Sequence, residues 1–443
     1  MASGAQHNGY RQSSLRILMQ WFTIVFGFAV AVPSIIRFPD ASDGRARSAL
    51  SSKGGQSTGL HRNRFDAQER QKMSHRLSTY AIEELPVSED EARQFCHDLE
   101  AAARSSDSVA FTEQFSQPAC LHRVSATLPL ENRERIESML SSADPFGPIT
   151  SGILQAAGSG GDFKLVRFER SDGDIRPMFR RISVNPADVT YCELVLRRCN
   201  GHVRVVDFVA GSDGQTMSQV IGDGARRMIR VLDDSVQVYA NDPEVVFAER
   251  IADVEKLVRE ESYVRALNVI SDIPAQWKTD KVVMFTKCRA AEKVGEREFK
   301  QAFDELEKVF PNERATLQMK LRLCRRLRQH AEVIACVRQL MEDIQDPYLS
   351  VFMVPALLEL GRREEAEVVI RVVKDAADHR SEPWRLELEM SMSAMDHSRT
   401  ERVVAEMEKR FPDIDLNLSS LPGFDEFADS ERGSACLARR AGF

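Results

Sequence analysis

The sequence lacks the short motifs that carry most enzyme chemistry. It contains no H-E-x-x-H and no C-x-x-C, and its loop at residues 158–161 lacks the Lys-Ser/Thr of a phosphate-binding loop. The pairs Cys96-His97 and Cys120-Leu121-His122 fit no standard metal-site spacing. We therefore expect a non-enzymatic protein, with no catalytic, cofactor-binding or metal-binding residue to assign.

A disulfide framework and a basic folded domain are also missing. Eight cysteines are scattered along 443 residues, which favours buried free thiols. The net charge is -7, although residues 1–80 carry eleven Lys/Arg against four acids. Because this positive excess flanks a hydrophobic segment and forms no folded basic face, we expect no nucleic-acid partner.

One long uncharged run is present near the N-terminus. Twenty residues from Ile17 to Ile36 carry no charge, and about 20 apolar residues span a bilayer. We expect a transmembrane helix or signal anchor here, after a tail at residues 1–16 and before a flexible basic linker at residues 37–87. The flanking Lys/Arg residues favour a single-pass membrane protein with a cytoplasmic body. Export after cleavage of a signal peptide at Ala29-Val30-Ala31 is the alternative.

Residues 88–232 change from helical to strand periodicity. Ser88 with Glu91 forms a capping box that opens a helix. Alternating patterns then predict strands at residues 163–168, 175–182, 191–198 and 203–210. Asn200-Gly201 favours a two-residue hairpin turn, which sets Cys199 opposite His202 and Leu196 opposite Val205.

This order of helices before a curved antiparallel sheet resembles the NTF2-like cone fold. The resemblance rests on the stretches at residues 191–194, 203–207 and 214–218. It implies either a non-catalytic binding or dimerisation module, or a small-ligand site of the isomerase kind. Tyr191 and Asp207 are the candidate pocket residues, with Asp207 on a face with Val203 and Val205 and opposite Leu194. The alternative is that Asp207 is a strand-end carboxylate hydrogen-bonded to backbone.

The C-terminal half contains a repeated phrase. Glu-Lys-Val-Phe-Pro at residues 307–311 returns as Glu-Lys-Arg-Phe-Pro at residues 408–412, and each phrase closes an amphipathic helix. Equivalent positions recur at an average of about 34 residues, at Ala266, Ala302, Val333, Ala366 and Val403. The region at residues 244–412 resembles tetratricopeptide (TPR) repeats, with about five helix pairs and a C-terminal cap and tail at residues 413–443.

The expected fold class is therefore α+β: an N-terminal transmembrane helix, an NTF2-like α+β cone domain and a C-terminal all-α TPR-like solenoid. The resemblance implies a scaffold or adaptor that binds an unknown protein partner. A basic cluster at Arg322, Arg325, Arg326 and Arg328 is the candidate partner-binding site, and a solvated helix face is the alternative. A possible homo-oligomer, assembled through the solenoid, is a further interpretation.

Overall fold

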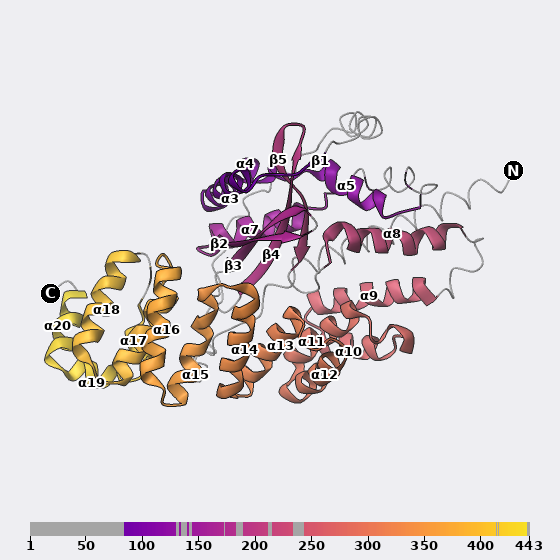
Figure 1. Ribbon diagram of the computed structural model, residues 1–443. Coiled ribbons are helices and arrows are strands. Elements are labelled where there is room, and N and C mark those ends of the chain that lie inside the picture. Colours follow the sequence, from indigo (N-terminus) through magenta and orange to yellow (C-terminus); the bar gives the residue numbers. More distant parts are fainter. Residues whose placement is uncertain are drawn as a thin grey trace, which may run out of the picture. The chain divides into compact units, whose positions relative to one another are not determined.

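The structure, a computed structural model, describes residues 84–129, 133, 140, 144–171, 173–182, 189–210, 215–233, 243–412, 414 and 416–440. The described chain divides into two compact units, the first ending at Thr316 and the second beginning at Leu317. The first unit holds an antiparallel sheet, the helices around it and the first helices of a helical array (Figure 1). The second unit holds the remaining helices of the array.

Helices and four long strands build the first half of the first unit. The helix α3 begins with the predicted capping box, because Ser88 accepts a hydrogen bond from the Glu91 backbone and the Glu91 side chain accepts one from the Ser88 backbone. This prediction is confirmed. The elements in chain order are β1 (Glu84–Leu85), α3 (Glu89–Arg104), α4 (Ser108–Thr112), α5 (Gln117–Ala126), α7 (Gly147–Gly158), β2 (Asp162–Ser171), β3 (Asp174–Ile182), β4 (Val189–Cys199), β5 (His202–Ala210) and α8 (Met217–Asp233).

The sheet is antiparallel throughout: β4 pairs with β1, β3 and β5, and β3 also pairs with β2. The hairpin prediction is confirmed: Cys199 pairs with His202 and Leu196 pairs with Val205. Asn200 and Gly201 have φ of 51° and 83°, as a tight turn of this hand requires. One face of the sheet packs on the helices and forms the main hydrophobic core with residues such as Phe95, Leu99, Phe111, Ile153, Phe179, Leu194 and Phe208.

Five successive helix pairs follow, and each has a first and a second helix. Pairs one and two lie in the first unit, and α13 crosses into the second unit. The pairs are α9 (Pro243–Arg259) with α10 (Tyr263–Ser271), α11 (Lys281–Val294) with α12 (Glu296–Val309), α13 (Arg314–Arg326) with α14 (His330–Ile344), η3 (Pro347–Phe352) and α15 (Met353–Glu359) with α16 (Arg363–Ala376), and α17 (Glu382–Ser393) with α18 (His397–Arg410). The short helices η2 (Ala275–Trp277), η4 (Leu418–Ser420), α19 (Phe424–Asp429) and α20 (Glu431–Arg440) complete the described fold.

Four of the five pairs turn in the same way. A residue with positive φ, which we call the turn residue, stands two positions before the second helix in these pairs: Glu261, Arg328, Gly361 and Met395, with φ of 55°, 53°, 70° and 55°. The next N–H donates to the carbonyl five residues back, which is the hydrogen bond of a Schellman motif. These bonds are Ser262 to Leu257, Gln329 to Cys324, Arg362 to Leu357 and Asp396 to Ser391, at 2.8, 2.8, 2.8 and 3.0 Å. The turn therefore recurs with a period of 33 to 34 residues.

The turn fixes the register of the repeat more finely than the sequence pattern does. The fifth residue after each turn residue is buried, namely Ala266, Val333, Ala366 and Thr400. In the second pair Phe299 takes this place, because its N–H donates to Gly295 as that of Thr400 donates to Asp396. The prediction placed Ala302 and Val403 here and is wrong by one helical turn. Ala302 and Val403 are nevertheless buried, because residues three apart share a face of a helix.

The two repeated phrases do mark equivalent helix ends, as predicted. Phe310 caps α12 with φ of -125° and ψ of 62°, and Phe411 caps α18 with φ of -130° and ψ of 64°. The N–H of each donates to the carbonyl four residues back, at 2.9 Å to Leu306 and 2.8 Å to Met407. The proline that follows each Phe has no N–H to continue the helix.

The prediction of a transmembrane helix, and with it of a single-pass membrane location, is corrected by the structure. Across the described ranges no helix has both the length and the apolar character needed to cross a bilayer. The longest of these helices, α8 and α9, have 17 residues each and carry several charges. The run at residues 17–36 lies outside the described residues. The corrected architecture is an antiparallel sheet with its helices and a helical C-terminal region.

Candidate functional site: the first-helix surface of the second unit

The four predicted arginines do not share one face. Arg322 and Arg325 lie three residues apart on α13, so they project from the same side of the helix, and both are half-buried. Arg326 is exposed on the next side of α13. Arg328 is the exposed turn residue of the third pair, with φ of 53°. The structure therefore brings Arg322 and Arg325 together and separates Arg328 from them.

Contacts within the second unit hold these two arginines. The guanidinium of Arg325 lies 5.0 Å from the centre of the Phe352 ring, which is the cation–π arrangement. Phe352 is buried at the end of η3 and so presents a fixed ring to Arg325. Arg322 Nη1 lies 3.5 Å from the sulfur of Met319. A guanidinium group recognises a carboxylate through two parallel hydrogen bonds.

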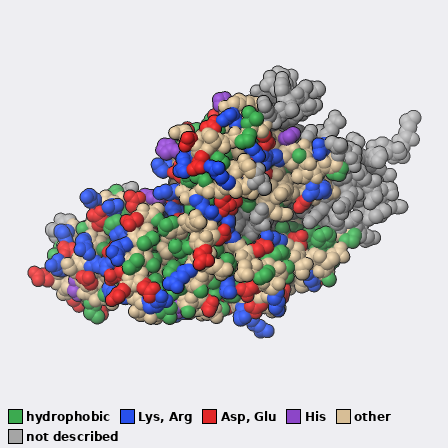
Figure 2. Space-filling model, in the orientation of Figure 1, with side chains coloured by type: hydrophobic (Ala, Val, Ile, Leu, Met, Phe, Trp, Pro, Cys, Tyr) green, Lys and Arg blue, Asp and Glu red, His purple; other side chains and the backbone are tan. Residues whose placement is uncertain are grey.

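The residues equivalent to Arg322 in the later pairs differ from it in chemistry. Arg322 stands six residues before its turn residue, and the equivalent residues are Pro355 on α15 and Glu389 on α17. Pro355 is exposed and Glu389 is half-buried. Burial raises the pKa of Glu389, and Arg385 offsets part of this effect. We call these three positions, with Arg325, the first-helix surface. Figure 2 shows acidic and basic side chains interspersed over the visible face of the protein.

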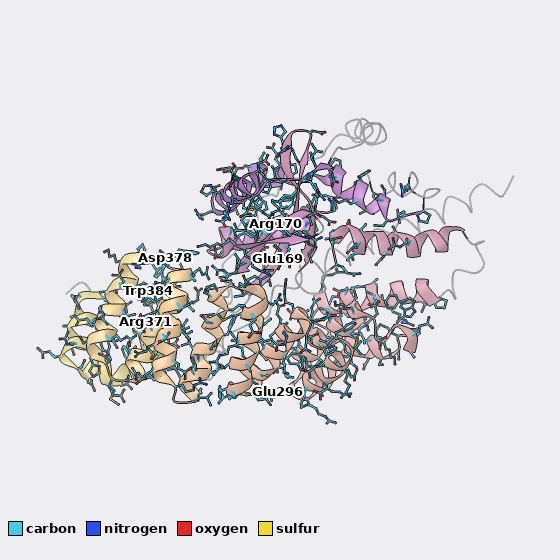
Figure 3. The ribbon with its side chains drawn as sticks, in the orientation of Figure 1. Glu169, Arg170, Glu296, Arg371, Asp378 and Trp384 are labelled. Atoms are coloured by element: carbon cyan, nitrogen blue, oxygen red, sulfur yellow. The ribbon has the colours of Figure 1, made fainter. Side chains whose placement is uncertain are left out.

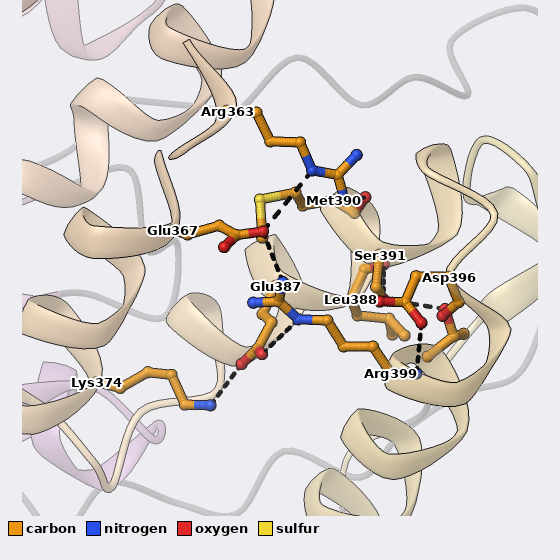
Figure 4. Close-up of polar contacts among 10 residues, drawn as sticks. Arg363, Glu367, Lys374, Glu387, Leu388, Met390, Ser391, Asp396 and Arg399 are labelled. Atoms are coloured by element: carbon orange, nitrogen blue, oxygen red, sulfur yellow. Dashed lines mark hydrogen bonds and ion pairs between the residues drawn. The ribbon is translucent and has the colours of Figure 1, made fainter. Parts of the chain in front are cut away.

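An ion-pair network ties the fourth and fifth pairs together (Figure 4). Arg399 on α18 donates to Glu387 on α17 at 2.9 Å and to Glu367 on α16 at 2.8 Å. Lys374 on α16 donates to the other oxygen of Glu387 at 2.6 Å. Burial raises the pKa of Glu387, but hydrogen bonds and charge from Lys374 and Arg399 outweigh burial and leave its pKa below the ordinary value. The network joins three helices and stabilises the stacking of the two pairs.

Trp384, labelled in Figure 3, adds an aromatic contact to this junction. Its ring is buried at the start of α17, with Lys374 Nζ 3.1 Å and the Arg410 guanidinium 4.8 Å from the ring centre. A cation close to an indole face is stabilised by the ring quadrupole. Sequence reasoning missed this junction because its members come from three helices, and no spacing rule links residue 374 to residue 387 or residue 399.

Asp207 is fully buried in β5, and both of its carboxylate oxygens accept hydrogen bonds. Its Oδ1 accepts from the backbone N–H groups of Phe208 at 2.9 Å and Ser218 at 3.1 Å, and its Oδ2 accepts from the Ser218 hydroxyl. Burial raises the pKa of Asp207, while the bonds from Ser218 and Phe208 offset part of this increase. Ser218 lies in the first turn of α8, so this carboxylate caps the α8 N-terminus from a neighbouring strand. The arrangement matches a carboxylate bonded to backbone.

A β-bulge places Asp207 on the face opposite to the predicted one. Leu196 pairs with Val205 but Val195 pairs with Asp207, so Val206 is an extra residue in β5. One inserted residue reverses the side-chain alternation beyond it. Val205 and Phe208 both lie in the main core, three residues apart, whereas Asp207 is opposite Val195 and not Leu194.

Tyr191 does not converge with Asp207. Tyr191 is buried on β4 opposite Arg180 of β3, while Asp207 lies opposite Val195, four residues further along β4. Four strand residues span about 13 Å. The two predicted pocket residues therefore share a face of the sheet without meeting at one point.

Comparison with known proteins gives no relative for this chain: no family model, no curated protein and no solved structure matches it.

Proposed function

We propose that the protein is a non-enzymatic scaffold that binds a protein partner across the first-helix surface of its tetratricopeptide-like helix pairs. The observation that supports the proposal most is the turn repeated at Glu261, Arg328, Gly361 and Met395. A turn that recurs with the period of the pairs presents each first helix in the same local register to its own second helix.

The contrast between interior and surface positions supports binding over a purely structural role. The buried position five residues after the turn residue keeps small or apolar side chains, or a threonine whose hydroxyl is hydrogen-bonded. The position six residues before it carries Arg322, Pro355 and Glu389 in successive pairs of the second unit. The buried position therefore repeats, while the chemistry six residues before the turn residue varies within the second unit, and such variation gives a repeat array specificity for a partner.

Affinity capture of the full-length protein from its native cell extract tests this proposal. The variant Arg322→Glu with Arg325→Glu reverses two charges on the first-helix surface, and we expect it to lose a partner that the unchanged protein retains. The matched control is Arg371→Glu with Arg402→Glu, which reverses two exposed arginines on the second helices α16 and α18. Figure 3 labels Arg371.

Quantitative mass spectrometry of the captured proteins compares these samples. Loss of one partner from the first variant and its retention by the control support the proposal. Equal retention in all samples, or equal loss in both variants, contradicts it. Thermal unfolding of each variant shows that loss of binding is not loss of fold.

A further inference from the structure

The strand β2 ends the sheet and has one open edge. It pairs with β3 along its other edge, and no described strand joins it on the open side. The outer edge of β5 differs, because Val205 exchanges backbone hydrogen bonds with Gln114 and Ser116 at 2.9 and 2.8 Å. The N–H and C=O groups along an open strand edge can pair with a strand of another chain. The edge of β2 is therefore where the described sheet can add a strand.

A carboxylate from α3 holds one donor on this open edge. Glu100 Oε1 accepts a hydrogen bond from the Leu165 backbone N–H at 2.5 Å, in the place that a carbonyl of a neighbouring strand would take. The Glu100 side chain is only 17% exposed. In a strand, backbone groups point to alternate edges as side chains alternate between faces. The residues of β2 that face the core, such as Leu165, therefore direct their backbone groups to the open edge.

A β-bulge determines which residues of β2 share a face. The ladder with β3 shifts by one residue at Val166, which is an extra residue in β2. An extra residue reverses the alternation of side chains beyond it. Leu165 and Phe168 consequently both pack against the main core, although they are three residues apart. Lys164 and Glu169 share the opposite face of the strand.

This pattern is complementary to itself. When two β2 strands run antiparallel with their bulges opposite one another, Leu165 of each copy faces Phe168 of the other copy. Lys164 of each copy then faces Glu169 of the other. Apolar pairs and opposite charges directly across two strands stabilise their pairing. The twofold relation makes each of these contacts twice.

The two charged residues are placed to make this contact. No ion pair joins Lys164 to another residue in the part of the chain that the structure describes. Glu169, labelled in Figure 3, is contacted by Arg167 and Arg314, and both arginines approach its Oε1 atom. The Oε2 atom of Glu169 can therefore accept from a lysine of a second copy.

Other registers bring together like charges or different faces. If the strands shift by two residues, Lys164 lies opposite Arg167 and Asp162 lies opposite Glu169, and both contacts are repulsive. The opposite shift sets Arg167 against Phe168, which lie on different faces of the strand. Charges and bulges on an edge strand hinder its pairing with unrelated strands. In β2 the same features select a second copy in one register.

We propose that the open edge of β2 is an interface with a second copy of the chain, in which the two β2 strands pair antiparallel with their bulges opposite. In this pairing the Leu165 N–H donates to the Phe168 carbonyl of the second copy, and Glu100 releases that N–H. Glu100 satisfies the donor while the chain is single. It thus competes with the second copy and limits the pairing of the strands.

Sedimentation equilibrium of the full-length protein over a series of concentrations measures this pairing. We expect a monomer–dimer equilibrium in which Lys164→Glu raises the dimer Kd about tenfold, because it sets like charges across the interface twice. The matched control is Lys308→Glu, which reverses an exposed lysine on α12 and should leave the Kd unchanged. Thermal unfolding of each variant shows that the fold is retained.

A mixture of two variants tests the register. Copies with Lys164→Glu repel one another, and so do copies with Glu169→Lys, but a mixed dimer has opposite charges at both contacts. We expect the mixture to dimerise more tightly than either variant alone. Equal association of the mixture and of both separate variants would contradict the register.

The variant Glu100→Ala tests the competition for the Leu165 N–H. It leaves this donor without its acceptor in the single chain, so we expect the dimer Kd to fall about tenfold. The mass of a single copy at every concentration, for the unchanged protein and for Glu100→Ala alike, would overturn the proposal. A dimer whose Kd does not respond to Lys164→Glu would also overturn it, because the interface would then lie elsewhere.

Discussion

Gly361 and Met395 lie 34 residues apart and hold the same left-handed backbone conformation, with φ of 70° and 55°. Each precedes a second helix by two residues, and the residue after each donates to a first-helix carbonyl at 2.8 and 3.0 Å. Glycine adopts this conformation freely, whereas a residue with a β-carbon does so at a cost of about 1 kcal/mol. The turn is therefore kept in the fifth pair with a residue that does not favour it.

Exchanging the residue types at these turns should change stability in opposite directions. Met395→Gly removes the strain of a side chain that is 61% exposed, and we expect the free energy of unfolding to rise by about 0.5 to 1 kcal/mol. Gly361→Ala should lower it by about 1 kcal/mol, although a β-carbon at Gly361 meets no atom within 4 Å. Urea unfolding measures both changes. The control Gln339→Gly, in an exposed helical site, should destabilise; stabilisation there would contradict the explanation.

Glu387 should contribute more to stability than an exposed ion pair does. Its side chain is 12% exposed and accepts from Lys374 and Arg399. We expect Glu387→Gln to lower the free energy of unfolding by about 2 kcal/mol at neutral pH, because two partly buried cations lose their common partner. Glu365→Gln, which removes a solvent-exposed pair with Arg362, is the control and should cause no resolvable change.

The effect of Glu387 should also depend on pH. Its folded-state pKa lies below the ordinary value of 4.5, so its contribution is fully present above 4.5 and is lost as the pH falls through the folded pKa. The difference between the unchanged protein and Glu387→Gln should therefore shrink in acid. A difference that stays constant through this range would show that the charge of Glu387 does not stabilise the fold.

Asp207 should be needed for its hydrogen bonds and not for its charge. Asp207→Ala leaves the Ser218 and Phe208 N–H groups without their acceptor and should destabilise by about 2 kcal/mol. Asp207→Asn keeps an acceptor oxygen and should leave the free energy of unfolding nearly unchanged at pH 7.

Because the folded pKa of Asp207 is raised above 3.8, the protein should lose stability as the pH rises through that folded pKa, and the Asn variant should lack this decrease. Urea unfolding across this pH range measures it, and equal losses in Ala and Asn would contradict the account.

The sequence predicts the elements of this fold better than their register. The capping box at Ser88 and the hairpin at Asn200 follow from local chemistry, and both are confirmed. Phe310 and Phe411 end equivalent helices because proline follows each. The turn residues Glu261, Arg328 and Met395 could not be recognised, because left-handed conformation is not encoded by these residue types.

The site was less predictable than the fold for two physical reasons. Periodicity alone cannot distinguish Thr400 from Val403, since both lie on the buried side of α18. The bulge at Val206 cannot be read from an alternating strand pattern, and it moves Asp207 to the other face of the sheet. Both outcomes depend on tertiary packing and not on local sequence.

Site-specific photo-cross-linking shows whether a protein partner binds the first-helix surface. A photoreactive amino acid replaces Gln318, four residues before Arg322 on α13, or the exposed Gln339 on α14 in the full-length protein. The account predicts a cross-linked partner from position 318 and none from position 339. Cross-linking from position 339 alone, or from neither position, would contradict it.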